Sequence, residues 1–167
     1  MALILIVDDE HGVRQVLARW IQGAGHEILE AESADAALQV MERQPAAVVF
    51  CDIQMPRRDG LWLTAELRKR YRTTAVILAT TVSTVAPTVS LQAGVLAYLV
   101  KPFSQEFVIR ALKAALAWHT ETAATGPRPE DTPERLQEWL DSLEQLVDST
   151  SLSAPIPGRA TPLIASP

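Results

Sequence analysis

The sequence LILIVDDE at residues 3–10 places five apolar residues directly before three acidic ones. An uninterrupted apolar run of this length is typical of a strand that is covered on both faces, as in a parallel sheet. The acidic residues at its end repel one another, so we expect them either to cap the next helix or to surround a cation. The residues at the ends of the other predicted strands decide between these two interpretations.

The alternation of apolar runs with helical periodicity continues to about residue 119. The predicted strands are residues 3–7, 27–32, 46–51, 75–79 and 96–100. A helix is predicted after each strand, with Ser33, Asp59 and Ser104 as N-caps and Pro87 in a first helical turn. Five β–α units in series predict an α/β fold with a doubly wound, five-stranded parallel sheet and helices on both faces.

Composition and charge exclude several classes of protein. Residues 1–119 contain twelve acidic and twelve basic residues, so residues 120–167 carry the whole net charge of −5. No basic tail or patch is present to neutralise phosphates, and we expect no nucleic-acid partner. The uncharged stretch 75–100 is long enough to cross a bilayer, but it contains too many polar residues for hydrocarbon. We therefore expect a soluble protein without a membrane partner.

Smaller features give structural expectations. The single cysteine, Cys51, excludes an internal disulfide, fits a reducing, cytoplasmic compartment and is predicted to be a buried strand residue. The basic run RKRYR at residues 68–72 is predicted to form the solvated face of a helix. The three histidines have no ligand-like spacing and are expected to be structural or exposed.

The last 48 residues differ in composition from the predicted domain at 1–119. Residues 120–132 are predicted to be a flexible linker, and residues 133–148 an acidic amphipathic helix with an apolar stripe. The Pro/Ser-rich residues 149–167 are predicted to be disordered. The stripe can pack on the domain, pair with a second copy of itself or bind another protein.

The predicted strands bring reactive side chains to one end of the sheet, where ligands bind in folds of this kind. These side chains are Asp8 and Asp9 after the first strand, Asp52 after the third, Thr80 after the fourth and Lys101 after the fifth. Three neighbouring carboxylates favour a hard divalent cation such as Mg²⁺, above all where phosphate also binds. Asp52 stands alone on a central strand and faces the pair, so it is the candidate nucleophile.

The segments IVDDE, FCDIQMPRRDG, VILAT and AG…Y.VKPF resemble the receiver domain of response regulators in two-component, histidine kinase–aspartate signalling, over residues 2 to about 119. The resemblance implies a flavodoxin-like strand order, 2-1-3-4-5. It implies that a histidine kinase or phosphotransfer protein phosphorylates Asp52, as in a phosphorelay. Asp9, Asp52 and the backbone carbonyl of Gln54 would hold Mg²⁺, with Asp8 in support.

The same resemblance implies a switch. Thr80 would move to the phosphoryl oxygen, Lys101 would pair with it, and Tyr98 would rotate inward as Thr80 moves. Thr81 is an alternative switch hydroxyl, although Thr80 ends the apolar run. The Lys101–Pro102 bond would be cis. The surface that changes would comprise the fourth helix, near Pro87, with the fifth strand and the fifth helix.

We therefore expect a single-domain response regulator that acts through an unknown output protein. It would not be an enzyme in the sense of turnover, because it would catalyse only its own phosphorylation and dephosphorylation. Alternatives are the N-terminal receiver part of a longer regulator and a phosphorylation-independent binding module. A phosphohydrolase with Asp52 as nucleophile is disfavoured because the enzymes it would resemble need a second acid at position 54, which is Gln54.

Overall fold

The computed structural model describes residues 1–81, 94–128, 132, 134–135, 137–138 and 141. The predicted helix near Pro87 lies outside these residues. Within the described residues, none of the helices is both long enough and apolar enough to cross a membrane.

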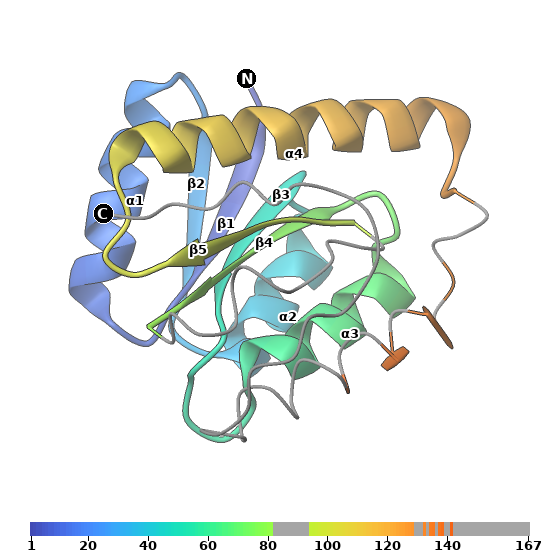
Figure 1. Cartoon of the computed structure of the whole chain (residues 1–167), viewed down its shortest axis with the longest axis horizontal. Coiled ribbons are helices and arrows are strands. Elements are labelled where there is room, and N and C mark those ends of the chain that lie inside the picture. Colours follow the sequence, from blue (N-terminus) through green and yellow to red (C-terminus); the bar gives the residue numbers. More distant parts are fainter. Residues whose placement is uncertain (82–93, 129–131, 133, 136, 139–140, 142–167) are drawn as a thin grey trace, which may run out of the picture.

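Five parallel strands form one sheet in the order β2-β1-β3-β4-β5, which confirms the predicted fold and strand order (Figure 1). The strands are β1 (Leu3–Val7), β2 (Glu27–Ala31), β3 (Val48–Asp52), β4 (Ala75–Thr80) and β5 (Val95–Val100). The helices around the sheet are α1 (His11–Gly23), α2 (Ala34–Arg43), α3 (Gly60–Arg70) and α4 (Gln105–Thr125). All residues of β3 and β4 are buried, whereas β2, with alternating polar residues, lies at an edge of the sheet.

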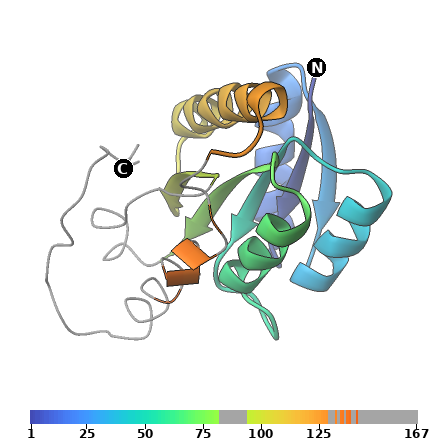
Figure 2. The ribbon, with the colours of Figure 1, turned by 90° about the vertical axis from the view of Figure 1, so that its right-hand side faces the viewer.

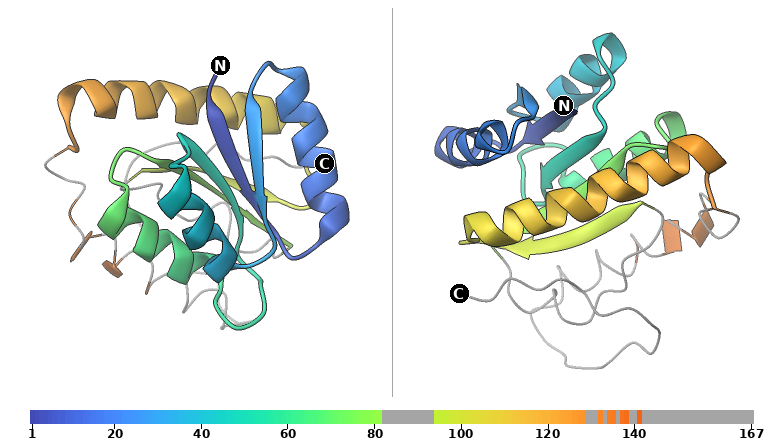
Figure 3. Two further views of the ribbon diagram at one scale, coloured as in Figure 1. Left: turned by 180° about the vertical axis from the view of Figure 1, so that it is seen from behind. Right: turned by 90° about the horizontal axis from the view of Figure 1, so that it is seen from above.

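The helices form two layers around the sheet. Helices α1 and α4 cover one face, and α2 and α3 cover the other (Figures 2 and 3). Leu17 and Ile21 of α1 and Leu112 of α4 are buried in the first of the two cores. Each such side chain stabilises the fold by about 1.5–3 kcal/mol on burial. The sheet is therefore buried between two apolar cores, one on each face.

Three helices begin at the predicted N-caps. The side chains of Ser33, Asp59 and Ser104 accept hydrogen bonds from backbone N–H groups of α2, α3 and α4. In α1 the N-cap is Glu10, which makes no capping hydrogen bond through its side chain. Asp8 accepts from the Glu10 N–H instead, at 2.9 Å. The described residues therefore do not support the interpretation that Asp8 and Asp9 are present to cap α1.

Helix α4 extends farther than the sequence pattern indicates. It ends at Thr125, so residues 120–125, predicted to belong to the linker, are helical. Thr122 is buried, and the Thr120 hydroxyl donates to the Leu116 carbonyl at 2.9 Å, which explains why these polar residues are tolerated. Gly126, with φ 84°, ends the helix. Residues 134–135, 137–138 and 141, inside the predicted tail helix, are also helical, whereas residues 149–167 lie outside the described part.

The prediction that the basic run 68–72 forms a solvated helix face is wrong for Arg68, which is buried. Its guanidinium lies 5.6 Å from the ring centre of Trp118 and donates to the carbonyls of Tyr71 and Arg72 at 3.2 and 3.3 Å. The Arg68 guanidinium therefore caps the carbonyls at the C-terminal end of α3. The sequence pattern alone shows only a run of basic residues there. Gly94 packs directly against Arg68 and Trp118, where a larger residue would collide with both.

Candidate functional site

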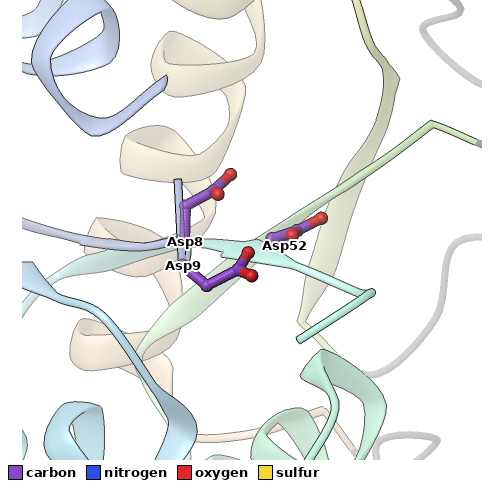
Figure 4. Close-up of side chains that lie close together, drawn as sticks. All are labelled: Asp8, Asp9 and Asp52. Carbon is purple, nitrogen blue, oxygen red and sulfur yellow. The ribbon is translucent and has the colours of Figure 1, made fainter. Parts of the chain in front are cut away.

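Three carboxylates meet at the carboxyl ends of β1 and β3. The two strands are neighbours, with Val7 opposite Cys51, so Asp8 and Asp9 lie beside Asp52. One oxygen atom from each carboxylate can be chosen so that all three lie within 4.8 Å of one another (Figure 4). Asp8 and Asp52 are buried, whereas Asp9 is exposed. The group is therefore anchored in the sheet and open to solvent on the side of Asp9.

A lysine that directly follows β5, Lys101, enters this acidic group. Lys101 Nζ lies 2.7 Å from Asp8 Oδ2, 3.5 Å from Asp52 Oδ1 and 3.6 Å from Glu10 Oε1. The Lys101–Pro102 peptide is cis, as predicted. The backbone N–H of Lys101 donates to the Thr80 carbonyl at 2.7 Å. This hydrogen bond joins the end of β4 to the loop that follows β5. The structure therefore brings the acids and the amine together, with the backbone of Thr80 at the same edge of the sheet.

Burial and charge set the protonation of this group. Burial, followed by the charge of Asp8, raises the pKa of Asp52 from 3.8 to about 6, although Lys101 opposes the shift. Burial lowers the pKa of Lys101, but its hydrogen bond with Asp8 and the nearby acids outweigh burial and raise that pKa overall. At neutral pH the lysine is a cation among more numerous carboxylates. The excess negative charge and the all-oxygen donor set fit a hard divalent cation such as Mg²⁺.

Arg14 holds the loop that carries the two adjacent acids. Its Nη1 donates to the Asp8 carbonyl oxygen at 2.7 Å, and its Nε pairs with Glu30 Oε2 of β2 at 3.1 Å. The Arg14 side chain is only 12% exposed. Sequence reasoning missed this residue because Glu30 is sixteen positions away and becomes its neighbour only when β2 pairs with β1.

Gly60 allows α3 to begin directly against Asp52. A Cβ at this position would collide with the carbonyl oxygen of Asp52 and lie 2.9 Å from Cys51 Sγ. The Gly60 N–H also donates to the Ile53 carbonyl at 2.9 Å. The sequence predicts only that Asp59 caps this helix, because the close approach of the Gly60 backbone to Asp52 arises when α3 packs against β3. The glycine sets the backbone position of the candidate nucleophile.

The predicted switch residues lie on the two strands next to Asp52. Thr80 is buried at the end of β4, and Tyr98 is buried on β5 in the core below α2 and α3. Burial raises the pKa of Tyr98 to about 12, and the side chain of Thr80 partly opposes this shift. Thr81 is exposed, and its hydroxyl donates to Gln54 Oε1 at 2.7 Å. The Tyr98 side chain is thus already inside the fold, near Thr80.

An apolar pocket of about 430 Å³ adjoins Lys101 and Thr81, between the start of α1 and the loop that joins β5 to α4. The other pocket residues are Glu10, Gly12, Val13, Val16, Trp20, Pro102 and Phe103. The rings of Trp20 and Phe103 meet edge to face at 6.5 Å. Val16 of α1 lines this pocket and is 42% exposed.

Comparisons with known proteins point to one family. The family model described as "Response regulator receiver domain" matches residues 4–113. FleR, a response regulator protein of Pseudomonas aeruginosa, is 33% identical over 99% of this chain and 35% of its own length. The transcriptional regulatory protein PdtaR of Mycobacterium tuberculosis is 32% identical over 80% of this chain and 66% of its own length. The chain thus spans about a third of the length of FleR and about two thirds of the length of PdtaR.

A solved structure gives the same result. The crystal structure of the receiver domain of NtrX from Brucella abortus superimposes with a TM-score of 0.63 and 32% sequence identity. The alignment covers 68% of this chain and 98% of that domain.

Proposed function

Because the chain belongs to the response regulator receiver family, we propose that a histidine kinase or phosphotransfer protein phosphorylates it on Asp52 in a Mg²⁺-dependent reaction. The observation that carries this proposal is the position of Asp52, which lies within reach of Asp8, Asp9 and Lys101 at the carboxyl end of β3. The reaction makes the chain a signalling protein that modifies only itself.

Asp52 is suited to be the nucleophile. The pKa of Asp52 is about 6, so at neutral pH its carboxyl group is ionised in most of the molecules. In the transfer, a bond forms between a carboxylate oxygen and phosphorus while the bond from phosphorus to the histidine nitrogen breaks. The nitrogen keeps the electron pair of that bond and takes a proton from water. Positioning and neutralisation of charge supply the catalysis in reactions of this class.

The neighbouring residues divide the remaining tasks. Asp9, Asp52 and the backbone carbonyl of Gln54 would hold Mg²⁺, and Asp8, which is already bound to Lys101, would support them. When bound, Mg²⁺ neutralises the charge of the phosphoryl oxygens. Lys101 is 3.5 Å from Asp52 Oδ1 and remains a cation, so its ammonium can pair with a phosphoryl oxygen.

We infer that phosphorylation is transmitted through Thr80 and Tyr98. Thr80 lies on β4, which pairs with the strand of Asp52, and its carbonyl accepts a hydrogen bond from the backbone N–H of Lys101. A shift of Thr80 toward the phosphoryl group would therefore also move the loop between β5 and α4. Tyr98 lies on β5, opposite Leu78 of β4. The output surface would include the segment near Pro87, β5 and α4, and an unknown protein would bind there.

One alternative is supported by the comparisons. The matched part covers 35% of FleR and 66% of PdtaR, as expected if this chain were the N-terminal receiver part of a longer regulator. The reading frame beyond codon 167 distinguishes the two forms. A phosphorylation-independent binding module is disfavoured because Asp8, Asp9 and Asp52 are all retained and meet in space.

The test is the intact mass of the protein after incubation with a small phosphodonor, with and without Mg²⁺. We expect one phosphoryl adduct on the wild-type protein in Mg²⁺ and none after chelation. Asp52→Asn should remain folded, since Asn has nearly the same size, and should remain unmodified. Labelling of Asp52→Asn would place the acceptor elsewhere, and the absence of an adduct on the wild type would favour the binding module.

A further inference from the structure

Arg14 joins the loop that carries Asp8 and Asp9 to the edge strand of the sheet. Its Nη1 donates to the Asp8 carbonyl oxygen at 2.7 Å, and its Nε donates to Glu30 Oε2 of β2 at 3.1 Å. A third nitrogen, Nη2, lies 3.2 Å from His11 Nδ1. The guanidinium is planar and holds its donors in a fixed geometry. These contacts together therefore set the position of the Asp8 carbonyl relative to β2.

The Asp8 carbonyl belongs to the peptide group that joins the two acids. This group is planar, so the hydrogen bond from Arg14 also orients the backbone nitrogen and the Cα atom of Asp9. The side chains of the two acids are held unequally. The Asp8 carboxylate accepts hydrogen bonds from the Glu10 N–H and from Lys101 Nζ. Within the described residues, the exposed Asp9 carboxylate makes no hydrogen bond or ion pair, so its direction depends on the backbone that carries it.

The charge of Arg14 is unfavourable for a neighbouring site that binds a cation. Its side chain is only 12% exposed, so solvent screens the positive charge incompletely. Coulomb repulsion alone would make the guanidinium weaken the binding of Mg²⁺ by the acids. Positioning has the opposite sign, because outer partners that orient metal ligands raise the affinity for the metal, typically by about 10- to 100-fold. The two effects can therefore be separated by experiment.

We propose that Arg14 is a positioning residue that, together with Glu30, raises the affinity of the proposed Mg²⁺ site although it is itself a cation. The inference rests on the proposed binding of Mg²⁺ and adds two residues that do not touch the metal. Glu30 anchors the guanidinium to β2 and offsets its charge, and the guanidinium orients the peptide group between Asp8 and Asp9. The edge strand thereby contributes to a site built at the ends of β1 and β3.

The experiment titrates the full chain with MgCl₂ and follows backbone amide resonances to obtain the dissociation constant for Mg²⁺. Arg14→Met removes the guanidinium and keeps an unbranched side chain, and we expect it to bind Mg²⁺ about 10-fold more weakly than the wild type. Arg19→Met is the matched control. Arg19 is exposed on the same helix, and within the described part of the chain it makes no hydrogen bond or ion pair. Its replacement should change the affinity by less than about 2-fold.

Glu30 provides a second pair of variants. Glu30→Gln loses the charge but keeps an oxygen that can accept from Arg14 Nε, whereas Glu30→Met loses both. We expect Glu30→Gln to bind Mg²⁺ within about 2-fold of the wild type and Glu30→Met to bind it about 3- to 10-fold more weakly. An effect of charge alone would instead be equal in these two variants.

Equal or tighter binding of Mg²⁺ by Arg14→Met would overturn the proposal, and so would equal affinities of Glu30→Gln and Glu30→Met. Thermal denaturation in a chelator measures the stability of each variant separately. A lower stability of Arg14→Met with an unchanged affinity of the folded protein for Mg²⁺ would assign Arg14 a structural role only and would also overturn the proposal. Failure of the wild type itself to bind Mg²⁺ would instead overturn the proposed metal site.

Discussion

Lys101 Nζ lies between two buried carboxylates, 2.7 Å from Asp8 Oδ2 and 3.5 Å from Asp52 Oδ1. The lysine side chain is itself only 10% exposed. Solvent therefore screens this group weakly, and Lys101 stabilises both acids before any cation or phosphoryl group arrives. The same ammonium can later pair with a phosphoryl oxygen, so one residue serves the stability and the proposed chemistry of the site.

Replacement of Lys101 by Met should destabilise the protein. The change leaves Asp8 and Asp52 without their shared cation, and we expect the free energy of unfolding at pH 8 to fall by about 2–4 kcal/mol in the absence of Mg²⁺. Urea denaturation followed by circular dichroism measures this loss. The control is Lys69→Met, because Lys69 is 60% exposed and pairs with Glu66 on the surface. Its effect should be below about 1 kcal/mol, and equal losses in both variants would contradict this role of Lys101.

Asp52→Asn should stabilise the protein in a pH-dependent manner. Burial and then Asp8 raise the pKa of Asp52 from 3.8 to about 6, so the folded protein binds this proton more tightly than the unfolded chain. The wild type therefore loses stability as the pH rises from about 4 to 6, whereas the variant does not. We expect an advantage for the variant of up to about 3 kcal/mol above pH 7, vanishing near pH 4.

Thermal denaturation in a chelator between pH 4 and pH 8 measures this difference. Asp35→Asn is the matched control, because Asp35 is half exposed and should give a difference of less than about 1 kcal/mol at any pH. Added Mg²⁺ should raise the melting temperature of the wild type more than that of Asp52→Asn, since a ligand stabilises only the state that binds it. A stability gap that is constant across this pH range would show that Asp52 has an ordinary pKa.

Deletion of residues 132–148 should change self-association or partner binding and leave phosphorylation unchanged. The sequence predicts an apolar stripe on an acidic helix there, and such a stripe is stabilised when another surface covers it. Sedimentation velocity and partner pull-down measure the first property, and intact mass measures the second. Deletion of residues 149–167 retains the stripe and serves as the control. Identical sedimentation and identical pull-down for the 132–148 deletion would assign no such role to this helix.

Local patterns predicted the sheet and the gathering of acids. Apolar runs identify buried strands because a parallel sheet is covered on both faces, and the residue after each run must then lie at the same edge of the sheet. The features that the patterns missed depend on contacts between distant segments. Arg14 reaches Glu30 only after β1 and β2 pair, and Arg68 meets Trp118 only after α3 and α4 are both in place. The extension of α4 through polar residues likewise depends on the burial of Thr122.

Gly60→Ala should disturb the backbone that carries Asp52. A methyl group at this position collides with the Asp52 carbonyl oxygen and approaches Cys51 Sγ, and backbone cannot yield as a flexible side chain can. We expect the free energy of unfolding to fall by about 1–3 kcal/mol, as for other insertions of volume into a packed region. Gly12→Ala in α1 is the matched control, because nothing lies within 4 Å of a Cβ there. Alanine should stabilise that helix by up to about 1 kcal/mol. If chemical denaturation gave both alanine variants the same change in stability, the close approach of Gly60 to Asp52 would have no energetic consequence.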